Sequence, residues 1–272
     1  MSGDGVDDRA QDRRGDLGVP ASQDGGRDTE IAALVGRLTG ADDLDAESRR
    51  SLLARLVGLL AERARRTGAD GLRGGRWLAE LLTEIAPHLP VRDAATLSAH
   101  HGHLTGEPLA DSLVRTAMAA TTAVGAAGGA LAAVQFTAPP LLLTAPVQLA
   151  AETLVIAAIE VKLIAELHAV YGVQLHGSPT ARAGAYLTSW ARRRGIDPLK
   201  GGSLADALGT AAKAALRKRL VRTFGRTMTT MGPLLAGAAA GAALNRAATK
   251  RLAETIRADL RRQTGVPLAV RL

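Results

Sequence analysis

An uncharged run from Thr116 to Val134 constrains the fold of this chain more than any other feature. Arg115 precedes it and Gln135 follows it. About 20 apolar residues are enough for a helix to cross a membrane. Alanine and glycine dominate the run, however, and they insert less readily than leucine. The sequence therefore leaves two interpretations open, a membrane span and a helix buried inside the protein.

Prolines interrupt the chain directly after this run. Pro139, Pro140 and Pro146 exclude a continuous helix between residues 136 and 147, so we expect the chain to turn back there. The next helix is predicted at residues 147–171. Because it carries several acids and a lysine among its apolar residues, it does not match a simple membrane span.

The residues before the apolar run predict a different kind of structure. Residues 1–28 are rich in Asp, Arg and Gly and offer little apolar surface to bury, so we expect a disordered acidic tail. Apolar residues then recur at helical spacing in residues 30–40, 51–66 and 76–85. Residues 29–110 are therefore predicted to form a soluble helical segment, followed by an apolar and basic helical domain at 111–262 and a C-terminal tail at 263–272.

The composition of the 272 residues agrees with an all-α fold. Hydrophobic residues make up 47% of the chain but aromatic residues only 2%, and no strand-like alternation of any length is present. The chain has no cysteine, which excludes disulfides and cysteine-based zinc sites. The scarcity of aromatic side chains argues against a single-strand nucleic-acid reader, because such proteins stack bases on exposed rings.

Positive charge is concentrated in the C-terminal third of the chain. The net charge is +8, and residues 182–262 hold 17 Lys or Arg against four acids. Surfaces of this kind attract phosphate, either of lipid headgroups or of nucleic acid. We expect anionic-surface binding by two clusters, although a solvated helix face would explain them equally well. They comprise Arg192, Arg193, Arg194, Arg217, Lys218, Arg219, Arg222 and Arg226.

Small residues recur at helix-packing spacing in two places. Gly125 and Gly129, with Gly128 beside them, form one set, and Gly237 and Gly241 form another. Glycines four residues apart allow two helix backbones to approach closely. The pattern predicts a glycine zipper, within the chain or between chains; the alternative is chance in a chain rich in Ala and Gly.

The helix predicted at 147–171 carries five ionisable residues that we interpret as a polar seam. They are Glu152, Glu160, Lys162, Glu166 and His168. Lys162 and Glu166 are four residues apart, a spacing that usually marks a paired or solvated face. A proton-handling or catalytic role for this acidic helix is the alternative.

No catalytic or metal-binding pattern stands out in the sequence. His100, His101 and His103 favour a polar loop over a metal site, since adjacent histidines do not share a helix face. The chain has no phosphate-binding loop, nucleophile elbow, zinc-protease motif or dinucleotide fingerprint. We therefore expect a protein that is not an enzyme and has no cofactor.

From residue 119 onward the chain resembles the EcsC-like family of bacterial proteins. The resemblance rests on the small-residue run at 124–129, the Pro-broken segment, residues 163–172 and the run at 237–245. It covers residues 110–260. Ala138-Pro139-Pro140 departs from the acidic, Pro-containing turn expected of the family. The resemblance implies a helical, membrane-associated protein without assigned catalytic residues.

Together these features predict an all-α membrane-associated protein with a structural or regulatory role. We expect it at the cytoplasmic side of the plasma membrane, peripheral or inserted as a helical hairpin; a cytoplasmic protein is the alternative. Expected partners are an anionic lipid surface and helices of a second copy or another protein. Nucleic acid is the less favoured partner, because no DNA-reading motif is present.

Overall fold

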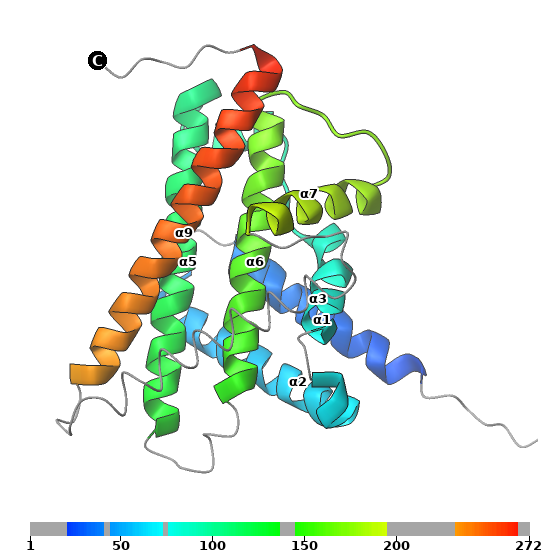
Figure 1. Ribbon diagram of the computed structural model, residues 1–272, viewed down its shortest axis with the longest axis vertical. Coiled ribbons are helices and arrows are strands. Elements are labelled where there is room, and N and C mark those ends of the chain that lie inside the picture. The colour runs from blue at the N-terminus through cyan, green and yellow to red at the C-terminus, as the bar shows by residue number, and fades with distance from the viewer. Residues whose placement is uncertain (1–20, 41–43, 73–75, 137–144, 195–231, 266–272) are drawn as a thin grey trace, which may run out of the picture.

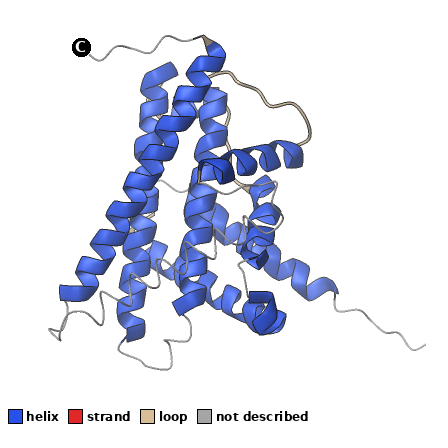
Figure 2. Ribbon diagram, viewed as in Figure 1, coloured by secondary structure: helices blue, strands red, loops and turns tan. Residues whose placement is uncertain are grey.

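The computed structural model describes residues 21–40, 44–72, 76–136, 145–194 and 232–265, and most of these residues lie in helices (Figures 1 and 2). No strand occurs within these ranges. The all-α prediction is therefore confirmed for the described part of the chain. In order along the chain the elements are α1 (Ala21–Gly40), α2 (Ala46–Leu72), α3 (Arg76–Ile85), η1 (Ala86–His88), α4 (Ala94–His100), α5 (Gly106–Phe136), α6 (Ala145–Val170), α7 (Pro179–Arg193) and α9 (Gly232–Thr264).

Helix α6 is the centre of the molecule. It contacts α1, α2, α3, α4, α5, α7 and α9, and every residue from 157 to 167 is buried. A helix that is apolar on all sides needs either lipid or protein around it, and here other helices surround it. The apolar character of α6 thus has a sufficient explanation in the packing of the bundle.

Helices α5, α6 and α9 run side by side along the long axis of the molecule, whereas α1, α2 and α3 pack across the lower part of α6 in Figure 1. Helix α5 is antiparallel to both α6 and α9, since Glu107 at its start reaches Tyr171 just after α6 and Arg261 near the end of α9. The predicted reversal of the chain between α5 and α6 is present. The reversing residues 137–144 lie outside the described ranges.

Two predicted boundaries fall inside helices of the structure. Helix α1 begins at Ala21, and Asp28 forms an ion pair with Arg63 of α2, so the last residues of the predicted disordered tail belong to a packed helix. The predicted division at residue 110 falls inside α5. Residues from Ile31 to Leu260 share one hydrophobic core, so the two predicted segments pack as one unit. Charge pairs between residues far apart in the sequence, such as Asp28 and Arg63, leave no signal in local composition.

The helix starts and ends follow from local chemistry where the caps are visible. Asp93 caps α4 by accepting a hydrogen bond from the Thr96 amide at 2.8 Å, and Ser178 caps α7 by accepting from the Ala181 amide at 3.2 Å. Such caps satisfy amides that have no partner within the helix. Helix α3 spans the predicted residues 76–85.

None of the helices in the described ranges is both long enough and apolar enough to span a membrane. The predicted uncharged run belongs to α5, where Val124, Ala127 and Gly128 are buried against other helices. The second interpretation, a helix buried in protein, describes these residues in the structure.

Candidate functional site

The ionisable residues of α6 point in several directions rather than along one seam. Lys162 and Glu166 face a cavity beside α1, α2 and α5. Glu160 faces α7 and α9, and His168 contacts Tyr186 of α7. The helical periodicity of 100° per residue separates these groups around the helix, and each meets a different neighbour.

Lys162 and Glu166 form a buried ion pair one turn apart, with a separation of 2.6 Å between Nζ and Oε1. Only 3% of the Glu166 side chain is exposed. Burial raises the pKa of Glu166, and the opposing effects of Lys162 and of the Arg92 backbone amide do not cancel it. This carboxyl group therefore accepts a proton more readily than an exposed one.

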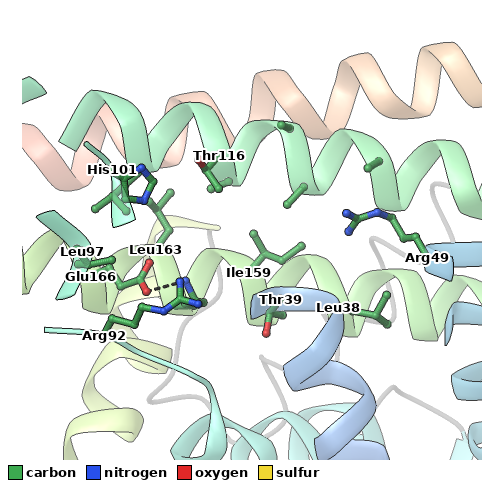
Figure 3. Close-up of a pocket in the computed structure, with 16 residues that line it drawn as sticks. Leu38, Thr39, Arg49, Arg92, Leu97, His101, Thr116, Ile159, Leu163 and Glu166 are labelled. Atoms are coloured by element: carbon green, nitrogen blue, oxygen red, sulfur yellow. Dashed lines mark hydrogen bonds and ion pairs between the residues drawn. The ribbon is translucent and has the colours of Figure 1, made fainter. Parts of the chain in front are cut away.

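The cavity beside this pair has a volume of about 240 Å³. Figure 3 shows Glu166, Arg92 and His101 at one end, Arg49 at the other and Ile159 between them. Sequence reasoning identified only the Lys162–Glu166 pair in advance. Arg49, Arg92 and His101 come from three separate segments, and no local pattern relates them to α6.

Glu160 is completely buried and holds three segments together. Its carboxylate accepts hydrogen bonds from Trp190 Nε1 at 2.8 Å and from Thr249 Oγ1 at 2.9 Å. The Arg194 guanidinium pairs with both carboxylate oxygens, with Nε at 3.0 Å from Oε2. A carboxylate satisfied on both oxygens by α7 and α9 is typical of a structural anchor.

Glu152 lies over a glycine of α5. A Cβ atom added at Gly128 would overlap the Glu152 carboxylate, so any larger residue there would force this buried side chain to move. Gln148 Nε2 donates to Glu152 Oε1 at 2.8 Å and to the Gly128 carbonyl at 2.6 Å. Gly128 therefore admits a polar contact between α5 and α6.

His168 is held on the side of α6 that faces α7. Its Nδ1 donates to the Ile164 carbonyl at 2.7 Å, and its ring meets the Tyr186 ring edge-on at 5.1 Å. Burial lowers the pKa of His168. A second hollow, a groove between α6 and α7, is lined among others by Val161, Ala183 and Tyr186. Glu152, Glu160 and His168 line neither this groove nor the cavity beside Lys162, so these two spaces do not bring the acidic helix together as a catalytic centre.

A further charged cluster, which sequence analysis missed, joins the ends of three helices. Glu107, in the first turn of α5, accepts from Tyr171 Oη at 2.7 Å and from Arg261 Nε at 2.7 Å, and it pairs with Arg257. These hydrogen bonds, led by that of Arg261, lower the pKa of Glu107 to about 2 against the opposing effect of burial. An acid at a helix start and arginines near a helix end also suit the helix dipoles. The pairing becomes visible only once α5 and α9 are known to be antiparallel.

The basic residues predicted to bind an anionic surface differ in exposure and in their ion-pair partners. Arg192 is exposed, Arg193 pairs with Asp259 of α9, and Arg194 pairs with Glu160. Two of the three arginines therefore hold α7 within the bundle. Arg217, Lys218, Arg219, Arg222 and Arg226 lie outside the described residues.

The small residues of α5 face α9 at close range. A Cβ atom at Gly125 would lie 3.3 Å from the Cα of Ala242 and 3.0 Å from Asn245 Nδ2. Gly129 is buried. Gly237 and Gly241 fall within α9, at positions whose surroundings lie outside the described part of the chain.

No protein-family model, curated protein or solved structure matches this chain significantly.

Proposed function

We propose that this protein is a non-catalytic helical bundle with a structural or regulatory role, and that it binds the anionic surface of a membrane at its cytoplasmic face. The binding surface would be the outer face of α9, here called the α9 face, which comprises Ala243, Leu244, Arg246, Ala247, Lys250 and Arg251. The basic residues at 217–226, which lie outside the described part of the chain, are expected to contribute to the same binding. The resemblance to EcsC-like proteins agrees with this proposal.

The proposal rests on one observation: an exposed apolar residue lies among basic side chains. Half of Leu244 is exposed, and in the described part of the chain only Val91 is comparable among large hydrophobic residues. Arg246, Lys250 and Arg251 are exposed close by. Apolar side chains flanked by Lys and Arg are the features by which a helix lies on an anionic lipid surface.

The acid on this face is a partial exception. Glu254 lies 3.8 Å from Lys250, and both side chains are about 60% exposed. An exposed pair of this kind contributes little energy. Lys250 can therefore exchange this partner for a lipid phosphate.

The non-catalytic part of the proposal draws support from the ionisable groups of α6. Glu160 is used to anchor α7 and α9, and Glu152 contacts Gln148 beside α5. Small residues also allow two helices to approach closely, as Gly125 of α5 and Ala242 of α9 do. As part of the same proposal, zipper-like contacts of this kind would pack helices within the chain and, on other faces, against partner helices.

Vesicle flotation tests the proposal. The full chain should float with vesicles of mixed phosphatidylcholine and phosphatidylglycerol at about 0.05 M salt and should be released at about 0.5 M, because salt screens surface charge. Binding that resists salt would instead indicate the inserted hairpin. Equal binding to pure phosphatidylcholine, or none to either vesicle, would overturn the proposal of an anionic surface.

A charge-matched pair of variants locates the surface. The triple substitution R246Q, K250Q and R251Q should weaken vesicle binding by about 1 kcal/mol per charge. The control R50Q, R55Q and R65Q removes the same charge from α2. If both triples weaken binding equally, net charge rather than the α9 face is responsible. Binding to duplex DNA without binding to vesicles would replace the membrane by nucleic acid.

A further inference from the structure

The cavity beside Lys162 is bounded by α1, α2, α5, α6 and the segment around α4. A volume of about 240 Å³ equals that of about eight water molecules at ~30 Å³ each. It can therefore hold a ligand of comparable size. None of its lining residues belongs to the α9 face, so ligand binding in this cavity is independent of the proposed membrane surface.

Cations outnumber acids around this cavity. Arg49, Arg92 and Lys162 line it together with one carboxyl group, that of Glu166, and one histidine, His101. With the histidine neutral, the lining has a formal charge of +2. Charges in a partly buried setting are screened less than those on a surface, so this excess favours an anion.

The two arginines make contacts that leave their planar groups beside the cavity. Arg92 donates to the Gly40 carbonyl at 3.3 Å, and Arg49 donates to the Leu44 carbonyl at 3.4 Å. Both contacts are long and use main-chain acceptors. A guanidinium group binds carboxylate and phosphate with two parallel hydrogen bonds, so an arginine at either end of the cavity suits an anionic head group.

Between its charged ends the cavity is apolar. Ile159 and Leu163 of α6 line it together with Ala117, Ala120 and Ala123 of α5. In Figure 3 Ile159 lies between Arg49 on one side and Glu166 with His101 on the other. A ligand with a charged head and a short hydrocarbon body matches this distribution.

The cavity can be reached from outside the bundle. Ala119 on its rim is exposed, and Thr116, Ala120 and His101 are half-buried. The cavity is therefore partly open to solvent on the side where these residues lie.

We propose that this cavity binds a small amphiphilic anion, with a carboxylate or phosphate head held by Lys162, Arg92 or Arg49 and an apolar chain of a few carbons against Ile159 and the alanines of α5. Glu166 would lower the affinity of this site for anions. It pairs with Lys162 and so competes with an incoming anion for the ammonium group.

Calorimetric titration of the full chain with four probes tests the ligand class. Hexanoate and hexyl phosphate carry the two heads, whereas hexanol and hexylammonium have the same number of carbons without the negative charge. Saturable binding of one or both anions, at least tenfold tighter than of either control, supports the proposal, and the preferred anion identifies the head. Equal binding of hexanol and hexanoate, or no binding of either anion, overturns it.

Three variants test whether Lys162 and Glu166 determine the affinity for the anion. Glu166→Gln should bind the preferred anion about tenfold more tightly, because it removes the competing charge a few ångströms away. The double variant K162Q and E166Q, which leaves no unpaired charge at this position, should lose that gain. Arg65→Gln, at an exposed position of α2 outside both the cavity and the α9 face, is the control and should bind as wild type. Unchanged or weaker binding in Glu166→Gln would overturn the assignment to this site.

Two alanine-to-leucine variants test independently whether the anion binds in this cavity. Ala120→Leu places a larger side chain into the cavity and should abolish anion binding. Ala126→Leu adds the same volume at an exposed position of α5 and should leave binding intact. Thermal unfolding of both variants without ligand shows whether each is folded. Normal binding by folded Ala120→Leu would show that the anion binds elsewhere and would refute the proposal.

Discussion

The described bundle contains two regions that are packed by different means. Helices α1, α2 and α3 contribute large aliphatic side chains to the core, among them Leu53, Leu56 and Leu81. Helices α5, α6 and α9 contribute many small ones, such as Ala151, Ala158 and Ala253. We call these the leucine region and the alanine region.

The alanine region also buries most of the polar groups of the core. Thr121, Glu160, Glu166 and Thr249 are buried there. Small residues permit close approach of helices, and short distances allow a side chain of one helix to reach the next. The Thr121 and Thr249 hydroxyl oxygens, for example, lie 3.2 Å apart across α5 and α9. The comparison indicates that the leucine region gains stability from apolar bulk, whereas the alanine region depends on fitted contacts and satisfied charges.

The largest effect is expected where a buried charge of the alanine region loses its partner. Arg194→Ala leaves Glu160 fully buried without its guanidinium and should lower the free energy of unfolding by about 3 to 5 kcal/mol. Chemical denaturation measures this loss. Arg192→Ala, two residues earlier and exposed, is the matched control and should change stability by less than about 0.5 kcal/mol. Similar values for the two variants would show that the Glu160 contacts are not structural anchors.

In the leucine region the corresponding effect comes from lost volume. Leu56 is completely buried in α2, so Leu56→Ala should cost about 2 to 5 kcal/mol through lost burial and a residual cavity. The exposed Leu244→Ala is the control, and it should have little effect in the same denaturation experiment. A loss below about 1 kcal/mol in Leu56→Ala would mean that this region tolerates voids and would remove the basis of the comparison.

Glycine substitutions sharpen the comparison, since Gly→Ala should lower the free energy of unfolding in the alanine region and raise it in the leucine region. Gly128→Ala forces its Cβ against Glu152 and should destabilise the fold by about 1 to 3 kcal/mol. Gly58→Ala in α2 meets no atom within 4 Å and should stabilise the protein by about 0.5 to 1 kcal/mol through helix propensity. Melting temperatures of both variants distinguish the signs. Stabilisation by Gly128→Ala would show that no close approach exists there.

The smallest effect concerns the Glu107 cluster at the ends of α5 and α9. Because its pKa is depressed to about 2 in the folded protein, Glu107 stabilises the fold above its usual pKa near 4.5, and this contribution is lost as the pH falls toward 2. About a third of the side chain is exposed, so screening reduces the effect to about 1 kcal/mol. The stability difference between wild type and Glu107→Gln should therefore shrink between pH 5 and pH 2, by about that amount. A difference that stays constant with pH would assign the stabilisation to hydrogen bonding alone.

The sequence by itself determined the secondary structure and much of its placement. Helix α3 matches the predicted range, and α1 ends at the predicted Gly40, because apolar spacing and helix-ending residues act locally. The uncharged run was equally informative about helix formation. It could not decide between lipid and protein as the surroundings, since both offer an apolar environment to the same side chains.

Only the tertiary structure decided which charges meet. Periodicity placed Lys162 beside Glu166 because both lie on one helix, but Glu160 with Arg194, and Glu107 with Arg261, are separated by 34 and 154 residues. Arg49, Arg92 and His101 likewise reach the cavity from segments that the sequence leaves unrelated. Contacts between helices depend on their order, direction and rotation, which many weak contacts set together. The local pattern of a single sequence therefore specified the helices, and their packing specified the site.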